Sequence, residues 1–175
     1  VDVTTIVEKT GVKLEWGSVT LAAGEEQILT ADAAFTEVTP WNMETPVLYQ
    51  AVTTVYENGQ PVDDLIDRFG FREVKIEGKK ILFNGRALRI KGVCRHEDHP
   101  QFACALPYAA MQADLDLVKH LGASSIRMVH YPNDELFLDL CDEQGILLWE
   151  ENHARGFGLE QMQNPNFESQ CEACI

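Results

Sequence analysis

The sequence predicts an antiparallel β domain followed by the beginning of a parallel α/β barrel. Up to about Arg72 the side chains alternate with the two-residue period of strands, whereas after residue 90 short apolar strands alternate with helical patterns. Two of the later strands also lead directly into clusters of Arg, His, carboxylate and Pro, at residues 91–100 and 127–133. Parallel barrels present functional side chains at the carboxyl ends of their strands, so these clusters favour a barrel.

The amino-terminal half has the pattern of short antiparallel strands. Residues 1–5 and 12–15 alternate apolar and polar side chains, and residues 48–56 form a longer run rich in Val, Thr and Tyr. Turn-forming residues separate these runs: Gly11, Gly24, Pro40, Pro46 and the pair Asn58-Gly59. Short strands at this spacing, without helical periodicity, predict an antiparallel sandwich.

A hairpin and then a change of period follow. Asn84-Gly85 between residues 81–83 and 88–90 predicts a tight type I′ turn, because both residues tolerate a positive φ angle. After it the sequence predicts alternating elements: strand 90–93, helix 107–121, strand 126–129, helix 134–144, strand 146–149 and a further helix from about 165. This order predicts parallel strands joined by right-handed crossovers.

Three strands cannot close a barrel, so the sequence predicts only part of one. An open sheet with apolar helices along it has exposed edges that need a cover. We therefore expect self-association, or association with a further part of the barrel that covers the open sheet.

Composition excludes several classes of partner. Twenty-eight acidic residues against fourteen basic ones leave a formal net charge of -14, which repels nucleic acid and anionic membrane surfaces. No apolar run reaches the length of about 20 residues that spans a bilayer, and the amino end has no signal-peptide pattern. The expectation is a soluble protein, cytoplasmic or periplasmic. The cysteines are interpreted as reduced thiols, and the Cys171/Cys174 spacing as a chance pairing.

Charged and imidazole side chains follow each predicted barrel strand, which marks them as candidate site residues. His96, Glu97, Asp98 and His99 follow the first strand, His130 the second, and Glu150 to His153 the third. Two chemistries fit this set. One is a metal site with His96, His99, His130 and Glu150 around an activated water. The other is glycoside hydrolysis, in which imidazoles and carboxylates bind sugar hydroxyls while two further carboxyl groups act as acid/base and nucleophile.

An ordered series of segments resembles glycoside hydrolase family 2 over residues 41–175. The segments that carry the resemblance are Trp-Asn-Met-Glu-Thr-Pro at 41–46, Asp-Arg-Phe-Gly-Phe-Arg at 67–72, Arg-His-Glu-Asp-His-Pro at 95–100, Arg-Met-Val-His-Tyr-Pro at 127–132 and Leu-Leu-Trp-Glu-Glu at 147–151. Within the family the 95–100 run is most similar to β-galactosidases. β-Glucuronidases and β-mannosidases share the scaffold and remain alternatives for the sugar.

The resemblance implies an immunoglobulin-like β-sandwich, incomplete, over residues 1–73 and the first three strands of a (β/α)8 barrel over residues 74–175. It implies that His96 and His130 contact the galactosyl ring and stabilise the oxocarbenium-like transition state. The further candidates for positioning or substrate contact are Arg95, Asp98, Arg127, Glu150 and Asn152. No cofactor is assigned to this chain, although a divalent cation in the full-length enzyme stays an open alternative. Magnesium-binding members of the family use an acidic residue and a His after this strand, but the spacing of Glu150 and His153 differs from theirs, so the metal is not assigned to these residues.

The resemblance also places the two catalytic carboxylates elsewhere. In this family the acid/base follows the fourth barrel strand and the nucleophile the seventh, both beyond Ile175. We therefore expect part of a retaining enzyme that cleaves terminal β-D-galactosides, and expect this chain to be inactive alone. Two other classes stay open: a non-catalytic carbohydrate-binding or complementing module using His96, His130 and Trp149, and a metal-dependent hydrolase.

Overall fold

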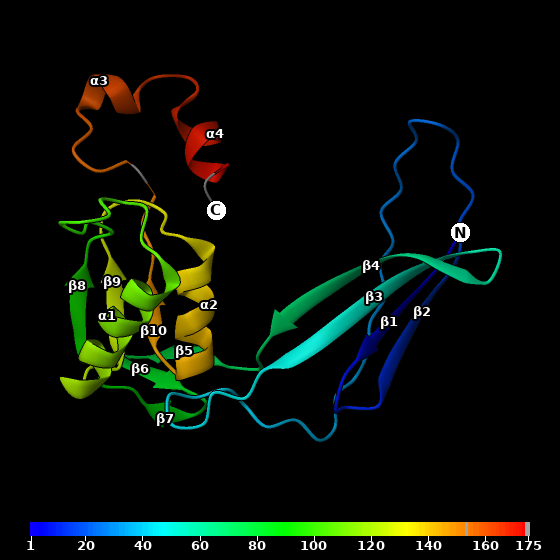
Figure 1. Ribbon diagram of the computed structural model, residues 1–175, viewed down its shortest axis with the longest axis horizontal. Coiled ribbons are helices and arrows are strands. Elements are labelled where there is room, and N and C mark those ends of the chain that lie inside the picture. The colour runs from blue at the N-terminus through cyan, green and yellow to red at the C-terminus, as the bar shows by residue number, and fades with distance from the viewer. Residues whose placement is uncertain (153, 174–175) are drawn as a thin grey trace. The chain divides into compact units, whose positions relative to one another are not determined.

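The computed structural model describes residues 1–152 and 154–173, which divide between two compact units (Figure 1). The first unit comprises Val1–Asn42 and Val47–Glu73, and the second comprises Met43–Pro46 and Val74–Ile175. None of the helices in the described part of the chain is long and apolar enough to cross a membrane. His153, considered for a cation site, and Cys174, the second cysteine of the x2 pair, lie outside the described residues.

The first unit is built around one antiparallel sheet. Its strands are β1 (Asp2–Val7), β2 (Val12–Ser18), β3 (Tyr49–Glu57) and β4 (Gln60–Phe69), in the spatial order β2-β1-β3-β4. Asn58 and Gly59 both have positive φ angles, 51° and 76°, as a tight turn between β3 and β4 requires. The prediction of antiparallel strands is confirmed.

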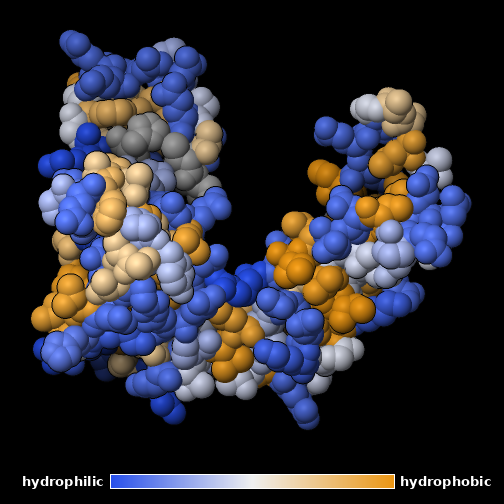
Figure 2. Space-filling view, in the orientation of Figure 1, coloured by the Kyte–Doolittle hydropathy of each residue, from blue (hydrophilic) through white to orange (hydrophobic). Residues whose placement is uncertain are grey.

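The first unit contains one sheet among its described residues, whereas a sandwich has two. Residues 19–48, all of which the structure describes, run without a regular strand or helix. The immunoglobulin-like assignment therefore stays a prediction. Apolar side chains of β4 are more than half exposed, namely Val62, Leu65 and Ile66. Figure 2 shows apolar side chains gathered over the strands of this unit.

Aromatic packing closes one end of this sheet. The Phe71 ring lies 5.4 Å from that of Tyr49 and 5.3 Å from that of Phe69, centroid to centroid. Trp41 is 2% exposed, and its backbone N–H donates to the carbonyl of Phe71 over 2.8 Å. Gly70 packs closely against it, since a Cβ at this position would lie 3.0 Å from Cβ of Trp41. Trp41, Phe69, Gly70 and Phe71, which belong to the 41–46 and 67–72 segments, are therefore packing residues.

The second unit begins with a small antiparallel sheet of β5 (Val74–Glu77), β6 (Lys80–Phe83) and β7 (Arg86–Ala87). The predicted Asn84-Gly85 turn is confirmed, with φ angles of 48° and 75°. The predicted second strand at 88–90 is wrong by two residues. A two-residue type I′ turn pairs Phe83 directly with Arg86, so the strand begins at once after Gly85.

The strand–helix alternation of the second unit agrees with the predicted order. It runs β8 (Gly92–Arg95), α1 (Tyr108–His120), β9 (Ser125–Met128), α2 (Glu135–Gln144) and β10 (Leu147–Trp149). The three strands are parallel and lie in the order β10-β9-β8. The sheet is open, as expected for part of a barrel. Two short helices follow, α3 (Leu159–Met162) and α4 (Phe167–Glu172), where the sequence predicted one from 165.

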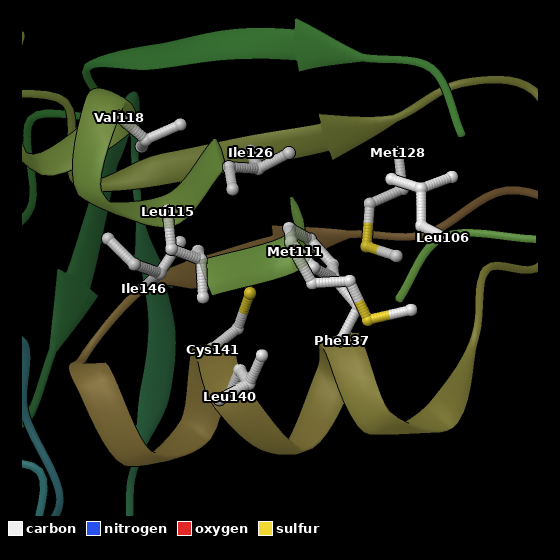
Figure 3. Close-up of a cluster of buried hydrophobic side chains, with 10 residues drawn as sticks. All are labelled: Leu106, Met111, Leu115, Val118, Ile126, Met128, Phe137, Leu140, Cys141 and Ile146. Carbon is white, nitrogen blue, oxygen red and sulfur yellow. The ribbon is translucent and has the colours of Figure 1, made fainter. Parts of the chain in front are cut away.

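Two helices bury one face of the parallel sheet. α1 contributes Met111, Leu115 and Val118, at the helical spacing that the sequence predicted. The core formed with them is shown in Figure 3 and consists of Leu106, Met111, Leu115, Val118, Ile126, Met128, Phe137, Leu140, Cys141 and Ile146. The Asp134 side chain caps α2 by accepting from the N–H of Leu136, and Gly145 ends the helix with a φ of 75°. This packing holds the strand ends in place.

Candidate active site

The carboxyl ends of β8, β9 and β10 meet at one edge of the parallel sheet. The register places Arg127 of β9 beside Cys94 of β8 and beside Trp149 of β10. Directly beyond these strand ends come side chains that the sequence marked as candidates: His96, His130 and Glu150. Parallel pairing therefore gathers residues that are up to 54 positions apart in the sequence, from His96 to Glu150.

His96 and His130 lie next to each other. Their ring centroids are 5.5 Å apart and the ring planes are inclined at 77°. His96 is exposed, and the His130 side chain is 20% exposed, so both rings are accessible to a ligand. Two adjacent imidazoles can bind neighbouring hydroxyl groups, since each ring nitrogen either donates or accepts a hydrogen bond.

Glu151 joins the second and third strand ends. Its Oε2 lies 2.9 Å from Nδ1 of His130, and its Oε1 accepts from Nε of Arg127 over 2.6 Å. The hydrogen bond from Arg127, followed by that from His130, lowers the pKa of the Glu151 carboxyl. The same carboxylate raises the pKa of Arg127, to which Cys94 also contributes. The carboxylate is therefore ionised and has both oxygens engaged.

The sequence interpretation gave Glu151 no role and assigned the position to Glu150. Oε1 of Glu150 instead accepts from the backbone N–H of Asn133, over a long 3.4 Å. The available signal was that two carboxylates, Glu150 and Glu151, directly follow β10, so either of them could face His130. Which one does so depends on where β10 ends, and a sequence places such ends only to within a few residues.

Arg95 is buried and makes structural contacts. Its Nε donates to Asp114 over 2.9 Å and its NH1 to Oδ1 of Asn133 over 3.1 Å. Its guanidinium carbon lies 3.8 Å from the centroid of the Phe137 ring. The side chain is 7% exposed, and Oε1 of Glu97 is 3.9 Å from its NH1. These partners form a buried ionic and hydrogen-bonded network, so of the two roles expected for Arg95 its contacts agree with positioning.

Asp98 and His99 are the remaining candidates of the loop after β8. Asp98 is exposed. His99 accepts at Nδ1 from the N–H of Gln101 over 3.1 Å and stacks on Phe102 at 4.8 Å, so its contacts are within its own loop. Within the described ranges no group of three or more His, Cys, Asp or Glu side chains is arranged to hold a metal ion. The structure thus does not assemble His99 with the other three members of the metal-site alternative.

Asn152 occupies a turn beyond β10. Its Oδ1 accepts from the N–H of Ala154 over 3.0 Å. The residue also lines an open cavity of about 600 Å³, together with Met162, Asn164 and Phe167 of the α3–α4 region. Neither histidine of the pair is among the residues that line this cavity.

Comparison with known families decides the classification. The family model described as "Glycosyl hydrolases family 2, TIM barrel domain" matches residues 74–173, and the model "Glycosyl hydrolases family 2" matches residues 2–72. The chain belongs to glycoside hydrolase family 2. The parallel sheet of the second unit is therefore the start of the family 2 TIM barrel domain.

Individual family 2 relatives carry several activities in their names. The chain is 55% identical to a β-galacturonidase from Eisenbergiella tayi, solved bound to galacturonate, with a TM-score of 0.88 over 99% of this chain and 31% of that one. A β-glucuronidase from Parabacteroides merdae is 35% identical, with a TM-score of 0.74 over 86% of this chain and 19% of that one. A β-galactosidase from Psychromonas ingrahamii is 38% identical over 119 residues, or 67% of this chain and 12% of the relative. The chain thus spans about an eighth to a third of the family 2 proteins it matches.

Proposed function

We propose that this chain forms part of the sugar-binding side of a retaining β-glycosidase site that acts on terminal sugars of galacto configuration. The observation that carries the proposal is the pairing of His96 with His130, 5.5 Å apart at the ends of adjacent parallel strands. Imidazoles in this position can hold ring hydroxyls through hydrogen bonds that shorten as positive charge develops on the sugar ring. The two carboxylates that cleave the bond are proposed to come from other segments of the enzyme.

Within that class, a β-galacturonide is favoured over the neutral β-galactoside expected from the sequence. The Eisenbergiella tayi β-galacturonidase is 55% identical and is matched over 99% of the chain, whereas the Psychromonas ingrahamii β-galactosidase is 38% identical over 67% of it. Galacturonic acid and galactose share the ring configuration and differ only at C6, so the two names agree on the sugar's hydroxyl pattern. β-Glucuronide, with the opposite configuration at C4, is the competing substrate.

The domain assignment supports this placement. We propose that residues 1–73 belong to an immunoglobulin-like domain and residues 74–175 to the first part of the barrel. The supporting observations are the family-model boundaries at 72 and 74 and the start of the second unit at Val74. Residues Met43–Pro46 belong to the second unit, where the backbone of Met43 packs against Gly145. Glycine permits this approach, because a Cβ at position 145 would lie 2.3 Å from the carbonyl oxygen of Met43.

A segment graft tests the function. This chain replaces the corresponding segment of the Eisenbergiella tayi β-galacturonidase, and kcat/KM is measured on p-nitrophenyl β-D-galacturonide, β-D-galactoside and β-D-glucuronide. We expect turnover of the galacturonide above the other two, and no turnover by the 175-residue chain alone. A graft with a normal thermal transition that prefers the glucuronide contradicts the proposed configuration, and one that turns over none contradicts the proposed role.

Single substitutions in that graft test the residues. His96→Ala or His130→Ala is expected to lower kcat/KM on the order of 10²–10³-fold, the usual loss for one transition-state hydrogen bond. His120→Ala is the matched control, because His120 lies exposed at the end of α1. Equal rates for all three variants would rule out sugar contact by the histidine pair. Galacturonate binding without turnover in a folded graft would favour the alternative of a non-catalytic sugar-binding module.

A further inference from the structure

We propose that Glu151 is a positioning residue that fixes the tautomer and orientation of His130, so that Nε2 of this ring faces the bound sugar as a hydrogen-bond acceptor. The proposal rests on the proposed function in one respect, the contact of His130 with sugar. It concerns a side chain for which the sequence gave no role. Its basis is a chain of contacts that links the ends of β9 and β10.

The hydrogen-bond chemistry allows one arrangement when the imidazole is neutral. An ionised carboxylate only accepts hydrogen bonds, so the 2.9 Å contact between Oε2 of Glu151 and Nδ1 of His130 requires the proton on Nδ1. Nε2 then carries the lone pair and accepts from a donor such as a hydroxyl group. Without a partner at Nδ1 the ring could take either tautomer and rotate.

Arg127 holds the carboxylate in this role. Its Nε donates to Oε1 over 2.6 Å, so the other oxygen remains directed to His130. Arg127 and His130 are three residues apart, around the end of β9, while Glu151 comes from the end of β10. Among the described residues, His130 contacts Glu151 directly, Arg127 binds the same carboxylate, and the ring of His96 lies at 5.5 Å.

The same geometry predicts an unusual effect of the isosteric substitution Glu151→Gln. Nε of Arg127 is a donor and needs an oxygen, so the amide oxygen of the new side chain must face Arg127. The amide NH₂ then faces Nδ1 of His130 and donates to it. The substitution therefore inverts the tautomer to Nε2–H, which presents a donor to the sugar where an acceptor stood, with almost no change in shape.

The tautomer is measured on the 175-residue chain itself. Two-bond ¹⁵N–¹H correlation spectra of ¹⁵N-histidine-labelled protein at neutral pH distinguish Nδ1–H from Nε2–H, and the spectrum of His130→Gln identifies the His130 signals. We expect Nδ1–H in the unmodified chain, Nε2–H in Glu151→Gln, and a mixture in Glu151→Ala. Glu135→Gln, an exposed position in the first turn of α2, is the matched control and should leave the signals unchanged. Nδ1–H in Glu151→Gln would overturn the proposal.

The consequence for turnover is measured in the graft described above. Glu151→Gln should lower kcat/KM by about 10- to 100-fold, the usual loss when a group that orients a site imidazole is removed. In a His130→Ala background it should have no further effect, since the residue acts through that ring. A general structural role would instead give additive losses, and additive losses would overturn the proposal.

The two proposals can fail separately. If His130→Ala leaves turnover unchanged while Glu151→Gln inverts the tautomer, Glu151 positions the ring and the sugar-binding function is wrong. If His130→Ala abolishes turnover while the tautomer stays Nδ1–H in Glu151→Gln, the function stands and the positioning role of Glu151 is wrong.

Discussion

The guanidinium of Arg95 lies on the face of the Phe137 ring, with 3.8 Å between its central carbon and the ring centroid. This contact joins the end of β8 to the buried face of α2. It explains how a charged side chain comes to be 7% exposed, because the ring face is electron-rich and Asp114 and Asn133 accept two of its hydrogen bonds. The residue that leads directly to His96 is thus anchored in the helix core.

Phe137→Ala should strongly destabilise the second unit. The side chain is fully buried in the core cluster, so the loss of packing and the cavity are expected to cost about 3–5 kcal/mol in the free energy of unfolding. Leu136→Ala is the control, because that neighbouring side chain is 42% exposed and should change stability by less than about 1 kcal/mol. Urea unfolding measures both. Similar losses for the two variants would contradict the assigned core.

Gly145→Ala and Gly122→Ala separate backbone strain from a steric clash. Both glycines end a helix with a positive φ, 75° and 71°, so each alanine costs about 1–2 kcal/mol from conformation alone. At Gly145 the new methyl group would also lie 2.3 Å from the carbonyl oxygen of Met43, whereas at Gly122 it meets nothing within 4 Å. We expect Gly145→Ala to be clearly the more destabilising in urea. Equal losses of stability would mean that residues 43–46 move away from the new methyl group at no cost in the free energy of unfolding.

The stabilising contribution of the Glu151 carboxylate should be lost in acid. The pKa of its carboxyl is lowered from the ordinary value of 4.5, first by the hydrogen bond from Arg127, so the folded chain binds that proton less tightly than the unfolded chain. The contribution is therefore complete above pH 4.5 and is lost as the pH falls through the lowered pKa. Unfolding free energies of the unmodified chain and Glu151→Gln, compared from pH 7 downward, should converge in acid. Curves that stay parallel would contradict this.

Cys141 should be the least reactive of the described thiols. Burial raises the pKa of its thiol from 9.0 to about 12, whereas Cys94 and Cys104 are exposed. A colorimetric disulfide reagent at pH 8 should label the two exposed thiols quickly and Cys141 only as the unit unfolds. The raised pKa of Cys141 affects stability in the opposite direction to the lowered pKa of Glu151. Its contribution to the free energy of unfolding is complete below pH 9.0 and is lost as the pH rises toward 12. Rapid labelling of Cys141 without urea would show that α2 opens.

Local pattern and turn chemistry determined the order of elements in this protein. Leu115 and Val118 recur at the spacing of a helix face, and Asn84-Gly85 admits the positive φ angles of one turn type. These are properties of neighbouring residues, so they can be read without knowing the fold. Sequence patterns also predicted that His96 and His130 follow strand ends, and sequence segments carried the resemblance to family 2. The 88–90 strand failed because the turn length, which sets the register, was read two residues too long.

The tertiary structure alone decided which charged side chains act together. Arg95 and Arg127 both lie on short apolar strands, yet one is 7% exposed against Phe137 and the other is 48% exposed beside Glu151. Glu150 and Glu151 are chemically identical neighbours, and only the end of β10 selects the one that faces His130. Parallel pairing brings Glu151 to Arg127 across 24 positions of sequence. Such contacts depend on strand register and side-chain direction at once, and neither is encoded within a single segment.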